Sequence, residues 1–109
     1  MVKRDWEQRT YKGDLKMKEF NIYTEDKPNI PLKDLMQRIN KRYPELQGNF
    51  SVFKGNGIYK GQQEYSLKIV IISDNVNYIY IEEMCGFLKK FLGQEAVLYT
   101  EQPIKARLI

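Results

Sequence analysis

The sequence predicts an α+β protein in which a four-stranded antiparallel sheet carries two helices on one face. Apolar and polar residues alternate over residues 15–24 and 64–73, which is the period of a half-buried strand. Apolar residues recur at the spacing of a helix over residues 32–43 and 81–92. The whole order is strand, helix, strand, strand, helix, strand. With right-handed crossovers, this order gives the ferredoxin-like βαββαβ arrangement, with 15–24 and 64–73 as the central strands.

The 109 residues are expected to form a single domain, 1–109, because domains most often hold about 100–150 residues. A hydrophobic fraction of 42% and a charged fraction of 29% are typical of a folded soluble chain. Residues 1–14 have no clear period. They are expected to form either a loose arm or a short edge strand.

The absence of histidine and the single cysteine, Cys85, restrict the chemistry. Histidine is the commonest general base near neutral pH, and one thiol supplies neither a disulfide nor a zinc site. We therefore expect no metal, no cofactor and no catalytic residue, and the protein is predicted not to be an enzyme. There is no apolar run of the ~20 residues that a membrane helix needs and no signal-peptide pattern, so a cytoplasmic protein without membrane contact is expected.

A strand-breaking stretch separates the first strand from the first helix. In the strand over 15–24, Phe20 and Ile22 are expected on the buried face. Two prolines then remove ladder donors and fix φ, and Pro44 ends the following helix. The buried stripe of that helix is expected to consist of Leu32, Leu35, Met36, Ile39 and Tyr43.

The hairpin that follows has two candidate turns. Asn56-Gly57 is a strong two-residue hairpin signal, because both positions tolerate positive φ. A turn there would make the second strand unusually long. A turn at Gly61–Gln63 instead balances strands of about 49–60 and 64–73, with Gly55–Gly57 as a bulge. We favour the second turn.

The strand over 64–73 and the second helix are expected to share the core. The second helix ends at Gly93, which suits a left-handed C-terminal cap. The last strand is predicted over 94–100, and the residues after Pro103 form either a short extra strand or a docked tail. The residues of the third strand expected to face the helices are Leu67, Ile69 and Ile71.

The glycine-rich hairpin has no evident folding necessity before Leu67, which makes it the favoured binding site. Its glycines lead into a strand and not into a helix N-terminus, so turn geometry is favoured over a phosphate cradle. The last strand also begins with polar residues. The predicted binding residues are Tyr59, Lys60, Glu64, Tyr65, Lys68, Gln94 and Glu95.

Positive charge is concentrated in the first half of the chain. Residues 1–60 hold 13 Lys and Arg against 8 Asp and Glu, whereas residues 61–109 hold 5 against 6. A basic half is typical of a surface that meets phosphates or an acidic protein. The candidate phosphate contacts are Lys41, Arg42 and Lys54, which makes nucleic acid a candidate partner.

Apolar residues outside the expected core predict an interface. Val70 and Ile72 lie on the sheet face without helices, and Phe87 and Phe91 flank the buried stripe of the second helix. This is more apolar surface than a small monomer usually exposes. Either Trp6 and the C-terminal residues cover it, or a second copy does so in a homodimer.

Two motifs resemble small uncharacterised proteins encoded by phages and plasmids. Residues 57–66 read G-x-Y-x-G-x-x-E-x-S, and residues 94–98 read QEAVL after a helix. In those proteins a glycine-aromatic-glycine hairpin precedes a strand, and a Gln-Glu or Gln-Asp pair opens the last strand. The resemblance implies a mobile-element origin, where small domains often inhibit or redirect a host protein, including defence systems.

These observations favour a non-enzymatic module that binds a host or phage protein and modulates a host protein or a defence system. The alternative is a nucleic-acid or nucleotide binder that uses the basic N-terminal half and the hairpin over Gly55–Lys68.

Overall fold

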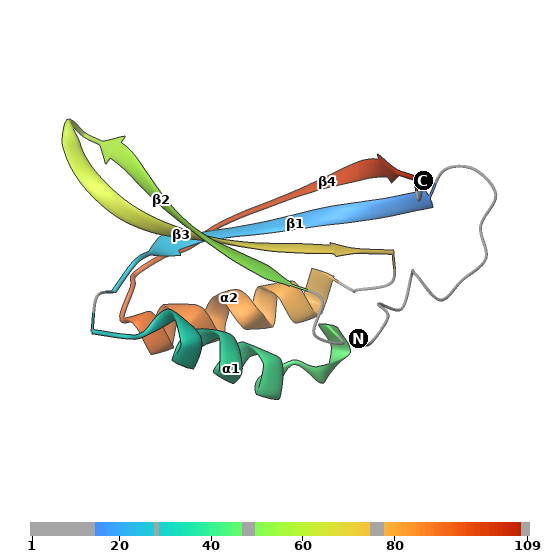
Figure 1. The fold of residues 1–109 in the computed structure, drawn as a ribbon, viewed down its shortest axis with the longest axis horizontal. Coiled ribbons are helices and arrows are strands. Elements are labelled where there is room, and N and C mark those ends of the chain that lie inside the picture. The colour runs from blue at the N-terminus through green and yellow to red at the C-terminus, as the bar shows by residue number, and fades with distance from the viewer. Residues whose placement is uncertain (1–14, 28, 47–49, 75–77, 108–109) are drawn as a thin grey trace.

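The computed structural model describes residues 15–27, 29–46, 50–74 and 78–107 (Figure 1). The predicted order of elements is confirmed. The strands are β1 (Leu15–Glu25), β2 (Ser51–Tyr59), β3 (Gln62–Ser73) and β4 (Leu98–Ala106). The helices are α1 (Leu32–Arg42) and α2 (Tyr78–Leu92), and a short 3₁₀ helix, η2 (Pro44–Leu46), follows α1.

The four strands form one sheet in the order β2-β3-β1-β4, with antiparallel neighbours throughout. Both helices lie on the same face of this sheet (Figure 1). Because β1 and β3 are the central strands, the predicted ferredoxin-like arrangement is confirmed. No helix formed by the described residues lies on the other face of the sheet.

Alternation along the central strands builds the core between the sheet and the helices. Phe20 and Ile22 of β1 are buried as predicted. The predicted residues of β3 and most of the apolar stripe of each helix meet them and remove apolar surface from water. Met36 of α1 was predicted in the buried stripe and is instead 37% exposed. The shared core includes Leu67, Ile69 and Ile71 from β3, Leu35 and Ile39 from α1, and Ile81, Met84 and Leu88 from α2.

The hairpin turns at Lys60-Gly61, where φ is 51° and 77°. The turn therefore lies beside the favoured Gly61–Gln63 position and not at Asn56-Gly57. The predicted bulge at Gly55–Gly57 is wrong, since the β2–β3 register runs without an offset from Ser51↔Val70 to Tyr59↔Gln62. A two-residue turn places equal numbers of residues on the two strands and leaves none to insert.

The last strand differs from its predicted bounds of 94–100. β4 begins at Leu98 and continues to Ala106, so it includes Pro103, which is paired in register with Lys18. Proline is tolerated there because β4 is an edge strand, where a missing N–H need not break the ladder. The residues after Pro103 thus extend β4 and form no separate strand or docked tail.

The hairpin extends beyond the end of β1. The β1–β3 ladder stops at Glu25↔Ser66, so the residues from Gln62 to Tyr65 pair with β2 alone. Figure 1 shows this part of the hairpin curving away from the rest of the sheet. The described side chains of this part are open to solvent, with Ile58 80% and Tyr65 63% exposed.

Two further predictions concern the N-terminal residues and a membrane-spanning helix. Trp6 and the rest of residues 1–14 lie outside the described residues, so the arm and the edge strand both stay predictions. Within the part of the chain that the structure describes, neither helix has the length and apolar character needed to cross a membrane.

Candidate functional site

A hollow of ≈ 890 Å³ lies where the hairpin extends past the end of β1. Three segments that are far apart in the sequence line it. They are the end of β1 with the residues after it, the first half of β3, and the loop from α2 to β4. The side chains that give the hollow its chemical character are Tyr23, Glu25, Lys27, Glu64, Tyr65, Gln94 and Glu95.

The antiparallel register explains why these segments meet. Tyr23 pairs with Lys68 on one side and with Leu98 on the other, so the end of β1 lies beside the first half of β3 and the start of β4. The backbone N–H of Asp26 donates to the carbonyl oxygen of Tyr65 at 3.0 Å, which ties the chain after β1 to β3.

The cap of α2 positions the third segment. Gly93 has a φ of 67°, and its N–H donates to Lys90 O at 3.3 Å while that of Gln94 donates to Lys89 O at 2.9 Å. This pair of bonds is a Schellman cap, which needs a left-handed residue where Gly93 lies. The chain then turns so that Gln94 Nε2 donates to the carbonyl oxygen of Glu25 at 3.3 Å.

The titratable side chains of the hollow are mainly acidic. Three are glutamates (Glu25, Glu64 and Glu95) and one is Lys27, which gives these four side chains a net charge of −2 at neutral pH. Lys27 Nζ lies 2.9 Å from Glu25 Oε2. Beside these charges are two aromatic rings, so the hollow suits a ligand with positive charge and a flat ring.

Four of the predicted binding residues line this hollow, namely Glu64, Tyr65, Gln94 and Glu95. Lys68 lies nearby on the sheet face without helices, where its Nζ is 5.7 Å from the centroid of the Tyr23 ring. Lys60 lies in the exposed hairpin turn and does not line the hollow. The Tyr59 side chain is outside the described residues.

Three lining residues, Tyr23, Glu25 and Lys27, were absent from the predicted site. Tyr23 belongs to no motif that marks a site in the sequence, and Glu25 and Lys27 lie in the stretch predicted to break the first strand. The predicted order of the strands could have identified these three residues. In the βαββαβ order, the end of the first strand must lie beside the first half of the third.

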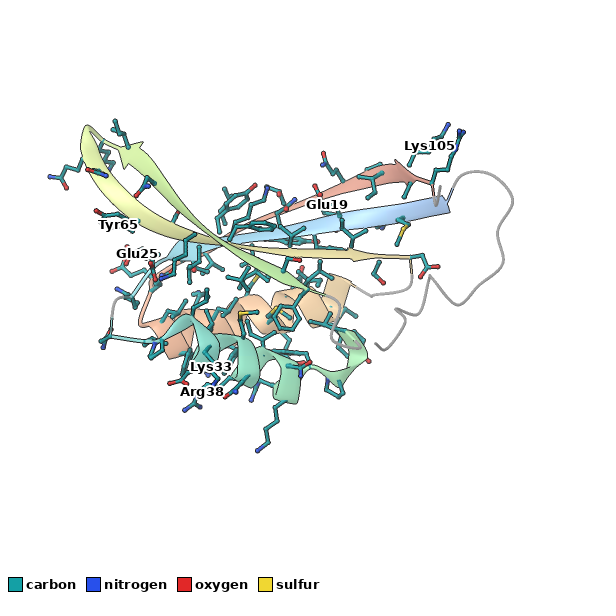
Figure 2. The ribbon with its side chains drawn as sticks, in the orientation of Figure 1. Glu19, Glu25, Lys33, Arg38, Tyr65 and Lys105 are labelled. Carbon is teal, nitrogen blue, oxygen red and sulfur yellow. The ribbon has the colours of Figure 1, made fainter. Side chains whose placement is uncertain are left out.

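Lys54 of β2 lies apart from the other two candidate phosphate contacts, Lys41 and Arg42, which are neighbours on α1. Lys54 Nζ is 3.6 Å from Asp26 Oδ2, so its charge is engaged at the hairpin. Lys41 and Arg42 belong to α1 in the helix layer. In Figure 2, Glu25 and Tyr65 lie at one end of the sheet, whereas Arg38 of α1 lies on the outer side of the helix layer.

The candidate interface residues also separate into two groups. Val70 is half-buried and Ile72 is 36% exposed on the sheet face without helices. Phe87 and Phe91 lie on the helix layer and are half-buried. Neither group shows whether a second copy of the chain binds there, so the homodimer stays a prediction.

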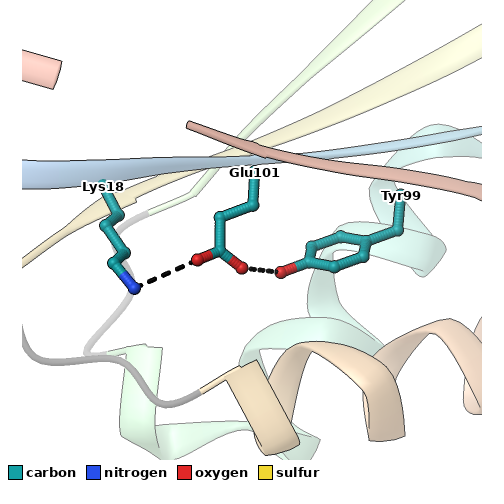
Figure 3. A network of polar contacts seen from close by, with 3 residues as sticks. All are labelled: Lys18, Tyr99 and Glu101. Carbon is teal, nitrogen blue, oxygen red and sulfur yellow. Dashed lines mark hydrogen bonds and ion pairs between the residues drawn. The ribbon is translucent and has the colours of Figure 1, made fainter. Parts of the chain in front are cut away.

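A second polar cluster joins β1 and β4 on the helix side of the sheet (Figure 3). Tyr99 Oη donates to Glu101 Oε2, and Lys18 Nζ donates to Glu101 Oε1 at 3.0 Å. Burial and this hydrogen bond raise the pKa of Tyr99 well above its usual value. The phenol therefore stays protonated as a donor and is unsuited to act as a base near neutral pH.

A third cluster lies on the sheet face without helices. Glu19 accepts hydrogen bonds from Asn21 Nδ2 at 3.2 Å and from Gln102 Nε2 at 2.8 Å, and these lower the pKa of Glu19. Asn21 is buried, and its Oδ1 has no hydrogen-bond partner among the residues that the structure describes. The bond from Gln102 joins β4 to β1, and the lowered pKa leaves Glu19 ionised at neutral pH.

Metal and thiol chemistry find no support among the described residues. No group of three or more acidic or cysteine side chains among them is placed to hold a metal ion. Burial raises the pKa of the Cys85 thiol, which favours the form that is a poor nucleophile.

The same fold occurs in a solved structure described as a phage SAM lyase in the apo state. The TM-score is 0.56 at 20% identity, and the similarity covers 94% of this chain and 98% of that chain. No family model matches the chain, and no curated protein matches it. The likeness therefore concerns the fold over nearly the whole of both chains.

This finding corrects the prediction that the protein is not an enzyme. That prediction used the absence of histidine and of metal ligands to favour a binding module. The phage SAM lyase is an enzyme built on the same fold. The inference was wrong because it excluded only the reactions that need a neutral-pH base or a metal.

Proposed function

We propose that the protein binds S-adenosylmethionine (SAM) in the hollow at the end of the sheet and cleaves it as a lyase. The observation that carries this proposal is the hollow itself, which is aromatic and net acidic. The fold shared with a phage SAM lyase supports the choice of ligand. A hollow of ≈ 890 Å³ is within the range of small-molecule sites, about 300–1,000 Å³.

The chemistry of SAM matches the lining groups. SAM carries a sulfonium cation, an ammonium group, a carboxylate and a flat adenine ring, so its net charge is positive. Tyr23 and Tyr65 offer ring faces for the adenine or the sulfonium. Glu64 and Glu95 offer carboxylates for the positive groups or the ribose hydroxyls, and Lys27 offers a cation for the SAM carboxylate.

Cleavage of a sulfonium explains how such a site works without histidine. When a carbon–sulfur bond of SAM breaks, the electron pair goes to sulfur, and the leaving group is a neutral thioether that needs no acid. The carbon side is satisfied in one of two ways: a carboxylate of the hollow accepts a proton from the neighbouring carbon as a carbon–carbon double bond forms, or the substrate's own carboxylate attacks the carbon and closes a lactone. Both routes balance without water, a metal or a second substrate.

The glutamates contribute mainly to binding in this scheme. The positive charge on sulfur disappears as the bond breaks, so a nearby carboxylate stabilises the ground state at least as much as the transition state. Acceleration then comes from holding SAM in a reactive conformation. We expect loss of a glutamate to weaken SAM binding more than it slows the bond-breaking step.

A phage or plasmid origin agrees with this function. The sequence motifs resemble proteins of mobile elements, and the solved structure with the same fold is a phage protein. An enzyme that removes SAM deprives host methyltransferases of their methyl donor. The proposal thus keeps a role in modulating host defence and replaces binding to a host protein by removal of a host metabolite.

Titration calorimetry with SAM tests the site. We expect Glu64→Gln and Tyr65→Ala each to raise the Kd for SAM by about tenfold, which corresponds to about 1.4 kcal/mol. Glu82→Gln is the matched control, because Glu82 is exposed on α2 and does not line the hollow. A Kd that all three variants leave unchanged, or no heat of binding at all, would contradict the site.

A further inference from the structure

Two arginines of α1 lie on two phenylalanines of α2 at the outer seam between the helices. Arg38 Cζ is 4.8 Å from the centroid of the Phe91 ring, and Arg42 Cζ is 4.8 Å from that of Phe87. The two rings stack on each other with centroids 5.6 Å apart and planes at 11°. Arg38 and Arg42 are one helical turn apart, so their guanidinium groups and the two stacked rings form one ordered ladder.

This ladder accounts for the half-buried Phe87 and Phe91. Their faces are covered by cations of the same chain. A guanidinium that stacks on a ring still presents N–H donors at its edges. The seam consequently offers positive donors whose positions are fixed before any partner arrives, which reduces the entropic cost of binding.

The surrounding helix surface is basic. The exposed charged residues of α1 are one acidic side chain, Asp34, and four basic ones, Lys33, Arg38, Lys41 and Arg42. The ion pair of Arg42 with Glu83 of α2 is long, at 3.8 Å, and both side chains are more than half exposed. A pair of this kind is screened by salt and gives way readily to a stronger anion.

Lys41 adds a third cation beside the two arginines on the outer surface of α1. Asp34, Gln37, Arg38 and Lys41 line a depression of ≈ 510 Å³ on the outer side of α1. These positions recur at the spacing of one helix face. Three cations thus lie within about one turn of α1, which rises about 5.4 Å along its axis.

We propose that the phosphate backbone of a nucleic acid binds to this arginine seam, defined as Arg38, Lys41 and Arg42. Cations grouped on one helix face suit a chain of phosphates, and edge-on guanidinium groups suit phosphate oxygens. The contacts expected are to the backbone, so the binding is not sequence-specific.

This surface is independent of the SAM site. Arg38 of α1 lies on the outer side of the helix layer, away from Glu25 and Tyr65 at the end of the sheet (Figure 2). Loss of nucleic-acid binding would leave the SAM proposal intact, and the reverse holds too. The seam would place an enzyme that consumes SAM close to the nucleic acids that methyltransferases modify.

Fluorescence anisotropy with a labelled DNA duplex and a labelled single strand tests the seam. We expect binding that weakens with salt, and a log–log slope for the duplex of about −2 to −3 for the three cations. Lys41→Gln should weaken binding at least threefold at about 50 mM salt and reduce the slope by about one. The double variant Arg38→Lys/Arg42→Lys keeps the charge and should bind more weakly than the wild type through the loss of bidentate donors.

Lys105→Gln is the control, since it removes the same charge from an exposed lysine at the far end of β4 (Figure 2). It should leave the affinity within twofold of the wild type. The proposal is overturned if no nucleic acid binds at low salt, or if Lys41→Gln and Lys105→Gln weaken binding equally. It is also overturned if polyglutamate binds to the protein and nucleic acid does not, since the seam would then serve an acidic protein.

Discussion

At the scale of single residues, the cluster of Lys18, Glu101 and Tyr99 links charge to fold stability. The Tyr99 hydroxyl and then Lys18 stabilise the ionised form of Glu101 and hold its pKa below its usual value. A carboxyl with a lowered pKa in the folded state stabilises the fold above its unfolded pKa. That stability is lost as the pH falls through the folded pKa.

Tyr99→Phe should therefore flatten the acid side of the stability profile. Without the phenol donor, the pKa of Glu101 returns toward its usual value, and less stability remains to be lost on acidification. We expect the decrease in Tm between pH 7 and about pH 3 to be smaller in the variant than in the wild type. Tyr80→Phe is the control on α2, and an equal decrease in all three proteins would refute the coupling.

At the scale of secondary-structure elements, the end of α2 connects the fold to the site. The left-handed Gly93 turns the chain toward the loop over 94–97, which lines the hollow. A Cβ at Gly93 meets no heavy atom within 4 Å, so a substitution there acts through its backbone conformation. Gly86, inside the same helix, has equal space and no positive φ.

Gly93→Ala and Gly86→Ala should consequently shift stability in opposite directions. We expect Gly93→Ala to lower the free energy of unfolding by about 1–2 kcal/mol, because alanine is strained in the left-handed region. Gly86→Ala should raise it by about 0.5–1 kcal/mol, because alanine is the better helix former. Urea denaturation measures both, and a gain in stability from Gly93→Ala would disprove the role of the cap.

The elements differ in how well the sequence predicts them. The buried faces of β1 and β3 could be predicted from the alternation of apolar and polar residues, because a buried face must be apolar at every second residue. The bounds of β4 did not follow, because Pro103 was interpreted as a break. A proline is tolerated at position 103 because β4 is an edge strand. The edge position is a property of the assembled sheet and not of the local sequence.

At the scale of the whole molecule, the topology explains which part of the site was predictable. Glu64 and Tyr65 were predicted because the hairpin has no evident folding role, and Gln94 and Glu95 because they open a segment after a helix. Glu25 and Lys27 needed the strand order, which brings the end of β1 beside β3. Composition misled the prediction of class, because the absence of histidine and of a zinc site excludes only the reactions that need those groups.

The uncovered face of the sheet concerns the whole molecule as well. Phe53 and Leu98 are 56% and 60% exposed, and Ile72 lies on the same face. Surface of this kind is consistent with the predicted homodimer. The hollow at the end of the sheet is formed within one chain, and the SAM proposal needs no second copy.

The most direct test of the central claim is to incubate the purified protein with SAM and to follow both substrate and products by liquid chromatography and mass spectrometry. The account predicts that SAM disappears over time without a methyl acceptor and that a thioether nucleoside appears in equal amount. Glu64→Gln should need more SAM to reach the same rate, whereas Glu82→Gln should match the wild type. SAM that stays intact with the wild-type protein under conditions where calorimetry detects its binding would contradict the lyase assignment.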